Sequence, residues 1–241
     1  MDANAKIGGV TRLNIRVDSL LAGAERAVGV VVIIDVFRAF TTAAVALAGG
    51  VTKIIIVRDV EEALALRAAG AGDLCMGEVG GRAPPGFDLG NSPFEASRAD
   101  LKGRTIIQRT SAGTQGIVAA RHATRLYAGS LLTATATARA ILCESPAEVT
   151  LVAMGLEGSR RTDEDELCAI HLRNLLQGRR GNPSGTRDVI LAGPQIPDFH
   201  DPAKPHLHPG DLDIALDIDR YDFAVRIFSE DGRLIARKVA A

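Results

Sequence analysis

The chain has 241 residues, of which 46% are hydrophobic and 24% are charged, as in an ordinary folded protein. Its formal net charge of -1 does not imply bulk attraction to nucleic acid or to anionic membranes. Three cysteines without C-x-x-C spacing argue against a disulfide framework and a zinc ribbon. No stretch reaches about 18 apolar residues, and the N-terminus lacks a signal-peptide pattern, so we expect a cytoplasmic protein.

Apolar runs and helix signals alternate along most of the chain. Residues 28–34 (VGVVVII) are continuously apolar, which is typical of a strand buried on both faces of a parallel sheet. Further strands are predicted at residues 53–57, 74–76, 104–108, 125–128 and 148–153, and helices at 41–47, 59–70, 114–121, 134–142 and 163–176. This alternation predicts a three-layer α/β/α fold with a mostly parallel sheet between two layers of helices.

The character of the sequence changes after Gly178. Residues 193–210 hold five prolines and three histidines and are predicted to form a loop. Asp231-Gly232 lies between two apolar runs and indicates a C-terminal β-hairpin. We expect this hairpin to close one sheet edge or to form a small appendage. No clear linker is visible, so residues 1–241 are predicted to form a single domain.

Polar side chains follow the first predicted strand at its carboxyl end, where open α/β sheets bind ligands. Asp35 there is either a site residue or a helix cap or loop carboxylate. Arg38 has a planar fork of donors that suits an anion or a carboxylate partner. Thr41 and Thr42 lie near a predicted helix N-terminus, where free N–H groups favour a phosphate.

The segment GEVGGRAPPGFDLGNSP at residues 77–93 is the most informative feature, because glycine and proline exclude helix and strand alike. A long irregular loop in a compact domain is functional, disordered or a solvated connection, and its well-formed flanks favour function. Its polar residues suit a metal, an anion or both, and they are Glu78, Arg82, Asp88, Asn91 and Ser92. Carboxylates that converge from different strand ends can hold Mg²⁺, which prefers oxygen ligands.

Two further segments each have two alternative interpretations. The string RTSAGT supplies Thr110, Ser111, Gly113 and Thr114 between a predicted strand and a helix, and it forms either an anion nest or a simple N-cap. The acidic residues 163–166 open a predicted helix, where they are partners of the helix dipole or metal ligands.

A Pro-rich stretch near the C-terminal end has the residue types of a metal site, namely Asp198, His200, Asp201, His206 and His208. Their spacing fits no zinc motif with defined spacing, so we do not predict a metal there.

These motifs occur in the order found in one known family. The chain resembles the 2-phosphosulfolactate phosphatases over roughly residues 10–178, at residues 35–42, 77–93 with Glu95, 109–114, 129–138 and Glu164-Asp165. The string GFDLGNSP at residues 86–93 is the most specific of them. Ala112 and Thr133 stand where many relatives have Asn, and residues 178–210 are shorter and richer in Pro and His than is usual.

The resemblance implies a Mg²⁺-dependent acid phosphatase with an α/β/α fold, which hydrolyses (2R)-phosphosulfolactate to (2R)-3-sulfolactate and phosphate in coenzyme M biosynthesis. The expected partner is then a small phosphorylated organic acid, with neither nucleic acid nor a membrane. The sequence is compatible with a homo-oligomer.

The expected site combines metal ligands with substrate contacts. We expect Asp35, Glu78, Asp88 and Asp165 to bind Mg²⁺ directly or through water, with Asp35, Arg38 and Glu78 as catalytic residues. The expected substrate-binding residues are Thr41, Thr42, Asn91, Ser92, Thr110, Ser111, Gly113 and Thr114.

Three rival interpretations differ in chemistry. A covalent aspartyl-phosphate route through Asp35 lacks its partner acid, because Phe37 occupies the second position of the D-x-D motif. A non-catalytic binder of a phosphorylated or sulfonated metabolite would use the same loops without a productive metal. A purely structural role is disfavoured by the many polar residues in glycine loops.

Overall fold

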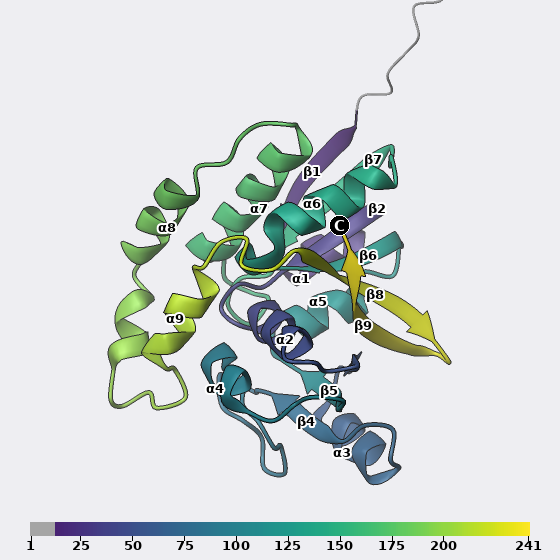
Figure 1. Ribbon diagram of the computed structural model, residues 1–241, viewed down its shortest axis with the longest axis vertical. Helices are drawn as coiled ribbons and strands as arrows, with labels where there is room; N and C mark the ends of the chain where they lie inside the picture. Colours follow the sequence, from purple (N-terminus) through teal and green to yellow (C-terminus); the bar gives the residue numbers. More distant parts are fainter. Residues whose placement is uncertain (1–12) are drawn as a thin grey trace, which may run out of the picture.

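The structure is a computed structural model that describes residues 13–241, and in this part of the chain nine strands form one sheet (Figure 1). The strands are β1 (Asn14–Ser19), β2 (Gly29–Ile34), β3 (Lys53–Ile56), β4 (Leu74–Gly77), β5 (Thr105–Arg109), β6 (Ala123–Gly129), β7 (Glu148–Ala153), β8 (Phe223–Glu230) and β9 (Arg233–Ala240). Their spatial order is β1-β7-β2-β6-β8-β9-β3-β5-β4. All pairs are parallel except those of β8 and β9, which confirms the mostly parallel sheet.

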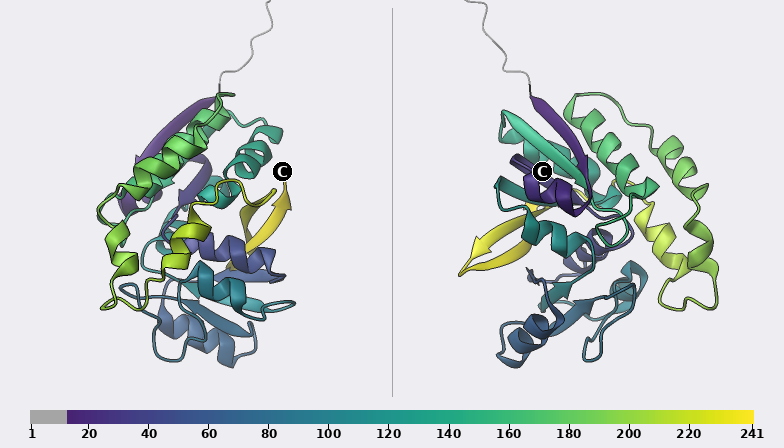
Figure 2. Two further views of the ribbon diagram at one scale, coloured as in Figure 1. Left: turned by 60° about the vertical axis from the view of Figure 1, so that its left-hand side comes forward. Right: turned by 180° about the vertical axis from the view of Figure 1, so that it is seen from behind.

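Helices cover both faces of the sheet (Figure 2). They are α1 (Leu20–Arg26), α2 (Ala39–Ala48), α3 (Val60–Ala68), α4 (Pro93–Arg98), α5 (Gly113–Ala119), α6 (Ala134–Cys143), α7 (Asp163–Leu176), α8 (Pro183–Leu191) and α9 (Pro209–Ala215), with 3₁₀ helices η1 (Leu131–Thr133) and η2 (Ile196–His200).

Strand β2 shows why the fold has three layers. Its residues Val31 and Ile33 join the core that contains α2 and α5, whereas Val32 and Ile34 join the core that contains α6 and α7. Successive side chains of a strand point to opposite faces, so a continuous apolar run requires a helix layer on each side. The α/β/α prediction is therefore confirmed.

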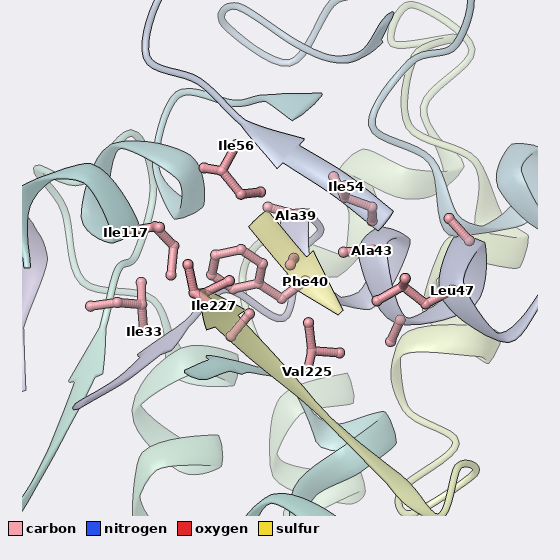
Figure 3. Close-up of a cluster of buried hydrophobic side chains, with 14 of the residues drawn as sticks. Ile33, Ala39, Phe40, Ala43, Leu47, Ile54, Ile56, Ile117, Val225 and Ile227 are labelled. Atoms are coloured by element: carbon pink, nitrogen blue, oxygen red, sulfur yellow. The ribbon is translucent and has the colours of Figure 1, made fainter. Parts of the chain in front are cut away.

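The C-terminal hairpin lies inside the sheet, so the expectation of an edge or an appendage was wrong. Strand β8 pairs with β6, and β9 pairs with β3, which places the hairpin between two groups of parallel strands. Val225 and Ile227 of β8 pack near Phe40 of α2 in one of the two main cores (Figure 3). The Asp-Gly turn signal is local and carries no information about which strands flank the hairpin.

Several elements lie in segments for which no helix or strand was predicted. They are β1, α1, α4, α8 and α9. The predicted loop at residues 193–210 contains η2 and ends as α9 begins at Pro209. Within residues 13–241, none of the helices has both the length and the apolar content needed to span a bilayer.

Candidate active site

A cavity of about 540 Å³ opens at the carboxyl ends of four parallel strands. Asp35 follows β2, Glu78 follows β4, Ser111 follows β5 and Gly155 follows β7, and all four line the cavity. The opposite wall comes from residues 195–207. This is the sheet edge at which ligands bind in open α/β folds, as the sequence predicts.

Asp35 is held in place by backbone N–H groups at the starts of two helices. Its Oδ1 accepts from Ala39 N–H at 2.9 Å, and its Oδ2 accepts from Gly113 N–H at 2.8 Å. Only 5% of Asp35 is exposed. A Cβ on Gly113 would lie 2.8 Å from Asp35 Oδ2, so this position requires glycine for the close approach. The expected nest at residues 109–114 therefore binds protein carboxylates in this structure.

Glu78 is held in the same way by groups of its own loop and of the segment after β5. Its Oε1 accepts from Ser111 N–H at 2.5 Å, and its Oε2 accepts from Gly81 N–H at 2.8 Å and from the Ser111 hydroxyl at 3.0 Å. The side chain is 6% exposed and lines the cavity. Glu78 thus joins the loop at residues 77–93 to the segment after β5.

Of two adjacent carboxylates at the start of α7, one lines the cavity and the other does not. Glu164 lines the cavity and accepts a hydrogen bond from Gln195 Nε2. Asp165 is 2% exposed and accepts from Val36 N–H at 2.7 Å and from Gly155 N–H at 2.8 Å. The predicted metal ligand Asp165 therefore holds the loops after β2 and β7, whereas its neighbour Glu164 faces the site.

The four buried carboxylates lie close enough to repel one another. Within residues 13–241, none of Asp35, Glu78, Glu164 and Asp165 forms an ion pair. Burial, assisted by the charge of Glu78, raises the pKa of Asp35 from 3.8 to about 7. Burial also raises the pKa of Glu164, and burial with the charge of Glu164 raises that of Asp165 well above its usual value. This accumulation of negative charge favours a cation.

The raised pKa of Asp35 makes the stability of the metal-free protein depend on pH. The folded state holds the proton up to about pH 7, whereas the unfolded state releases it near 3.8. The free energy of unfolding therefore falls as pH rises through this window. We expect thermal unfolding in a chelator to show a midpoint that decreases from about pH 4 to about pH 7 and then levels off, with a flatter curve for Asp35→Asn. Parallel curves for the two proteins would assign the effect to other groups.

Arg38 lines the cavity, and its guanidinium is already paired on one side. Its Nη1 donates to Asp211 Oδ2 at 2.9 Å and to the His206 carbonyl at 2.7 Å. The residue is 4% exposed. Of the two partners considered for Arg38, the carboxylate is therefore present in the structure, and the anion role stays a prediction.

The four predicted threonine contacts do not line the cavity. Thr41 and Thr42 donate to the carbonyls of Val36 and Arg38, at 2.7 and 2.9 Å. Thr110 and Thr114 cap each other through their hydroxyls and N–H groups. All four are completely buried. The hydroxyls that were expected to bind substrate therefore bond within the protein at the starts of α2 and α5.

Asn91 and Ser92 have different surroundings although they are adjacent. Asn91 lines the cavity and also a second cavity of about 600 Å³ next to it, and its buried Oδ1 has no hydrogen-bond partner among residues 13–241. Ser92 caps α4 by accepting from Glu95 N–H and donates to Asp211 Oδ1 at 2.5 Å. Asn91 is thus available to a ligand, and Ser92 is engaged within the protein.

The structure does not bring Asp88 to the other carboxylates. Its Oδ2 lies 2.5 Å from Arg67 Nη1 and accepts from Cys75 N–H at 2.8 Å, and the residue does not line the cavity. For the Mg²⁺-dependent phosphate release that the resemblance implies, we expect Asp88→Asn to leave the Mg²⁺ concentration for half-maximal activity unchanged, while the free energy of unfolding falls by about 1 kcal/mol. A magnesium titration of phosphate release checks this, and a higher magnesium requirement would support Asp88 as a ligand after all.

The cavity lining also contains residues outside the expected set of site residues. Those with polar or charged side chains include Arg160, Glu164, Gln195, Lys204 and His206. Arg160 lies in the connection after β7, so the strand-end rule contained a usable signal for it. Lys204 and His206 belong to the Pro- and His-rich segment, and Lys204 pairs with Asp198 at 2.6 Å. Which side of that segment faces the sheet depends on tertiary packing.

Exposed cationic side chains line the cavity together with the buried carboxylates. Arg82 of the loop at residues 77–93 and Arg160 both line it, and neither forms an ion pair within the described part of the chain. Phe37 packs edge-on against Phe199 of the opposite wall, with 5.2 Å between ring centroids. The position of a second acid in a D-x-D motif is thus occupied by an aromatic contact.

Comparisons with known proteins place the chain among named relatives. Residues 18–193 match the family model described as 2-phosphosulpholactate phosphatase. A protein named probable 2-phosphosulfolactate phosphatase from Carboxydothermus hydrogenoformans is 47% identical over 112 residues, which are 46% of each chain. Proteins of the same name from Deinococcus radiodurans and a Cyanothece strain are 38% and 35% identical over 61% and 66% of this chain, and over 62% and 67% of their own length.

The chain thus spans about half to two thirds of the length of the curated relatives it matches. The family match itself is longer and covers residues 18–193, which include Asp35, Glu78, Ser111 and Glu164. Because this match extends over most of the chain and contains the strand-end carboxylates of the cavity, the protein belongs to the 2-phosphosulfolactate phosphatase family.

Proposed function

We propose that this protein is a phosphatase that releases phosphate from a small phosphorylated organic acid, with 2-phosphosulfolactate as the first candidate. The main support is the convergence of three buried carboxylates, Asp35, Glu78 and Glu164, in a cavity that Arg82 and Arg160 also line. The names of the relatives support the same reaction. A role in coenzyme M biosynthesis and a cytoplasmic location belong to this proposal.

Mg²⁺ is the proposed cofactor. Among residues 13–241, no group of three or more His, Cys, Asp or Glu side chains is placed to enclose a metal ion. Mg²⁺ in phosphoryl-transfer sites needs only one or two carboxylates, because water and substrate phosphate complete its shell. Asp35 and Glu78 fit this requirement, since they are buried, have no paired cation and keep acceptor capacity beyond their N–H partners. When bound, the ion would neutralise charge on the phosphoryl oxygens.

The residues of the chain contribute positioning and charge. Backbone N–H groups fix Asp35 and Glu78, so these side chains need no rearrangement when substrate enters. The cationic groups of Arg38, Arg82 and Arg160 supply attraction for an anionic ester. Phosphoryl transfer depends mainly on such positioning and charge stabilisation.

Glu164 is our candidate for proton transfer at the attacking water. Burial raises its pKa, which brings a carboxyl group closer to the range useful for general acid–base catalysis. Gln195 Nε2 donates to its Oε2 and orients the carboxyl group in the cavity wall. The direct attack of water fits the absence of a second acid at Phe37.

A screen of phosphate monoesters tests the proposal. Sulfonated, carboxylated and neutral esters are incubated with Mg²⁺, with Mn²⁺ and with a chelator, and released phosphate is measured. We expect release from 2-phosphosulfolactate or a similar acidic ester, and its loss in the chelator. Esters that raise the melting temperature without any release would instead favour the non-catalytic binder.

A further inference from the structure

We propose that Asp211 is a positioning residue, which holds the Arg38 guanidinium by one edge so that its other edge faces the substrate. This inference rests on the proposed function. Asp211 lies in α9 and therefore outside residues 18–193, which match the family model. The C-terminal part of the chain would thus complete a site whose carboxylates lie in the matched part.

Asp211 connects three segments that surround the cavity. It is completely buried. Its Oδ2 accepts from Arg38 Nη1 at 2.9 Å and from His208 N–H at 3.3 Å. Its Oδ1 accepts from the Ser92 hydroxyl at 2.5 Å and from Phe94 N–H at 3.1 Å. One carboxylate thereby fixes the segment after β2, the loop at residues 77–93 and the cavity wall that ends at α9.

The hydrogen bonds of Arg38 are concentrated on one nitrogen. Its Nη1 donates to both Asp211 and the His206 carbonyl, at 2.9 and 2.7 Å. Its Nη2 has a single long contact of 3.5 Å to the Gly81 carbonyl, and its Nε has no acceptor among residues 13–241. Because the guanidinium is planar and rigid, fixing Nη1 also fixes the direction of the remaining donors. These donors belong to a residue that lines the cavity and suit phosphoryl oxygens.

Capping of α9 is the alternative role of Asp211, since its carboxylate accepts from the N-cap residue His208. Capping alone does not account for the buried ion pair with Arg38, in which Arg38 Nη1 lies 2.9 Å from Asp211 Oδ2. The Arg38 and Asp211 side chains are 4% and 0% exposed. A buried ion pair gains little net stability, because two charges must leave water. Holding Arg38 ready for a transition state is a function that this arrangement serves directly.

The test combines Asp211→Asn, Arg38→Met and the double variant, with Asp213→Asn as the matched control. Asp213 is an exposed residue of the same helix and should leave activity unchanged. We expect Asp211→Asn to lower kcat by about 100-fold, since a displaced catalytic group costs a factor of this size. The double variant should be as inactive as Arg38→Met alone, because Asp211 acts through Arg38. Calorimetry should show weaker binding of inorganic phosphate to Asp211→Asn.

Two results would overturn the inference. One is wild-type kcat and phosphate affinity in a folded Asp211→Asn protein. The other is a double variant whose loss is the product of the two single losses, which would show that Asp211 acts independently of Arg38. If Asp211→Asn does not fold, the double variant is used instead, because it lacks both buried charges. A kcat of the double variant equal to that of Arg38→Met then supports the inference, and a lower one overturns it. If the wild type releases no phosphate from any ester, the proposed function fails, and the calorimetry still tests the positioning of Arg38.

Discussion

Asparagine in place of Asp35 is expected to lower kcat/KM for phosphate release by about 10³-fold or more, while the protein stays folded. The substitution removes a carboxylate that lines the cavity and replaces one of its oxygens by a donor. That donor would face the N–H of Ala39 or Gly113, so one of two backbone hydrogen bonds is lost. Steady-state kinetics with Mg²⁺, together with circular dichroism and thermal unfolding, measure both parts of the expectation.

Asp59→Asn is the matched control for Asp35→Asn. Asp59 also follows a strand of the same sheet, at the N-cap of α3, but it is exposed and does not line the cavity. This variant should retain wild-type kinetics. If Asp35→Asn kept its Mg²⁺-dependent turnover, the carboxylate cluster could not be the catalytic centre, and the proposed function would lose its main support.

Alanine in place of Gly77 is expected to lower the free energy of unfolding by about 3 kcal/mol or more, or to prevent folding. Gly77 has a φ of +141°, and a Cβ there would lie 1.8 Å from the Arg109 carbonyl oxygen. That oxygen accepts from Glu78 N–H at 2.9 Å, so the clash falls on the contact that places Glu78 beside the segment after β5. Urea denaturation followed by circular dichroism gives the change in stability.

Gly80→Ala separates steric clash from backbone strain. Gly80 also has a positive φ, of +56°, but a Cβ there would meet no atom within 4 Å. We expect this variant to lose only about 1–2 kcal/mol, the usual cost of a left-handed conformation for a residue with a Cβ. Equal losses for the two variants would show that the close approach of Gly77 to Arg109 does not contribute.

The strand-end carboxylates were predictable because their signals are local. The run at residues 28–34 is apolar at every position, so it must be buried on both faces, and Asp35 must then lie at its end. Glu78 follows a short apolar segment in the same manner. The parallel arrangement brings such ends together at one edge, which is why Asp35 and Glu78 line one cavity.

Side-chain direction was not predictable in the same way. Thr41, Thr42, Thr110 and Thr114 were expected to contact substrate, but their hydroxyls bond within the starts of α2 and α5. A threonine near a helix start can bond to the backbone or to a ligand with similar geometry. The choice depends on which side the neighbouring strand and helix cover.

The sequence by itself determined the alternation of strands and helices, the apolar runs of the buried strands and the carboxylates that follow them, because neighbouring residues decide these features. Only the tertiary structure decided the long-range partners. The hairpin lies between β6 and β3, and Arg38 pairs with Asp211. Asp88 pairs with Arg67, whereas Glu164 lines the cavity. Such contacts join residues far apart in the chain, and they depend on how whole layers pack rather than on any local pattern.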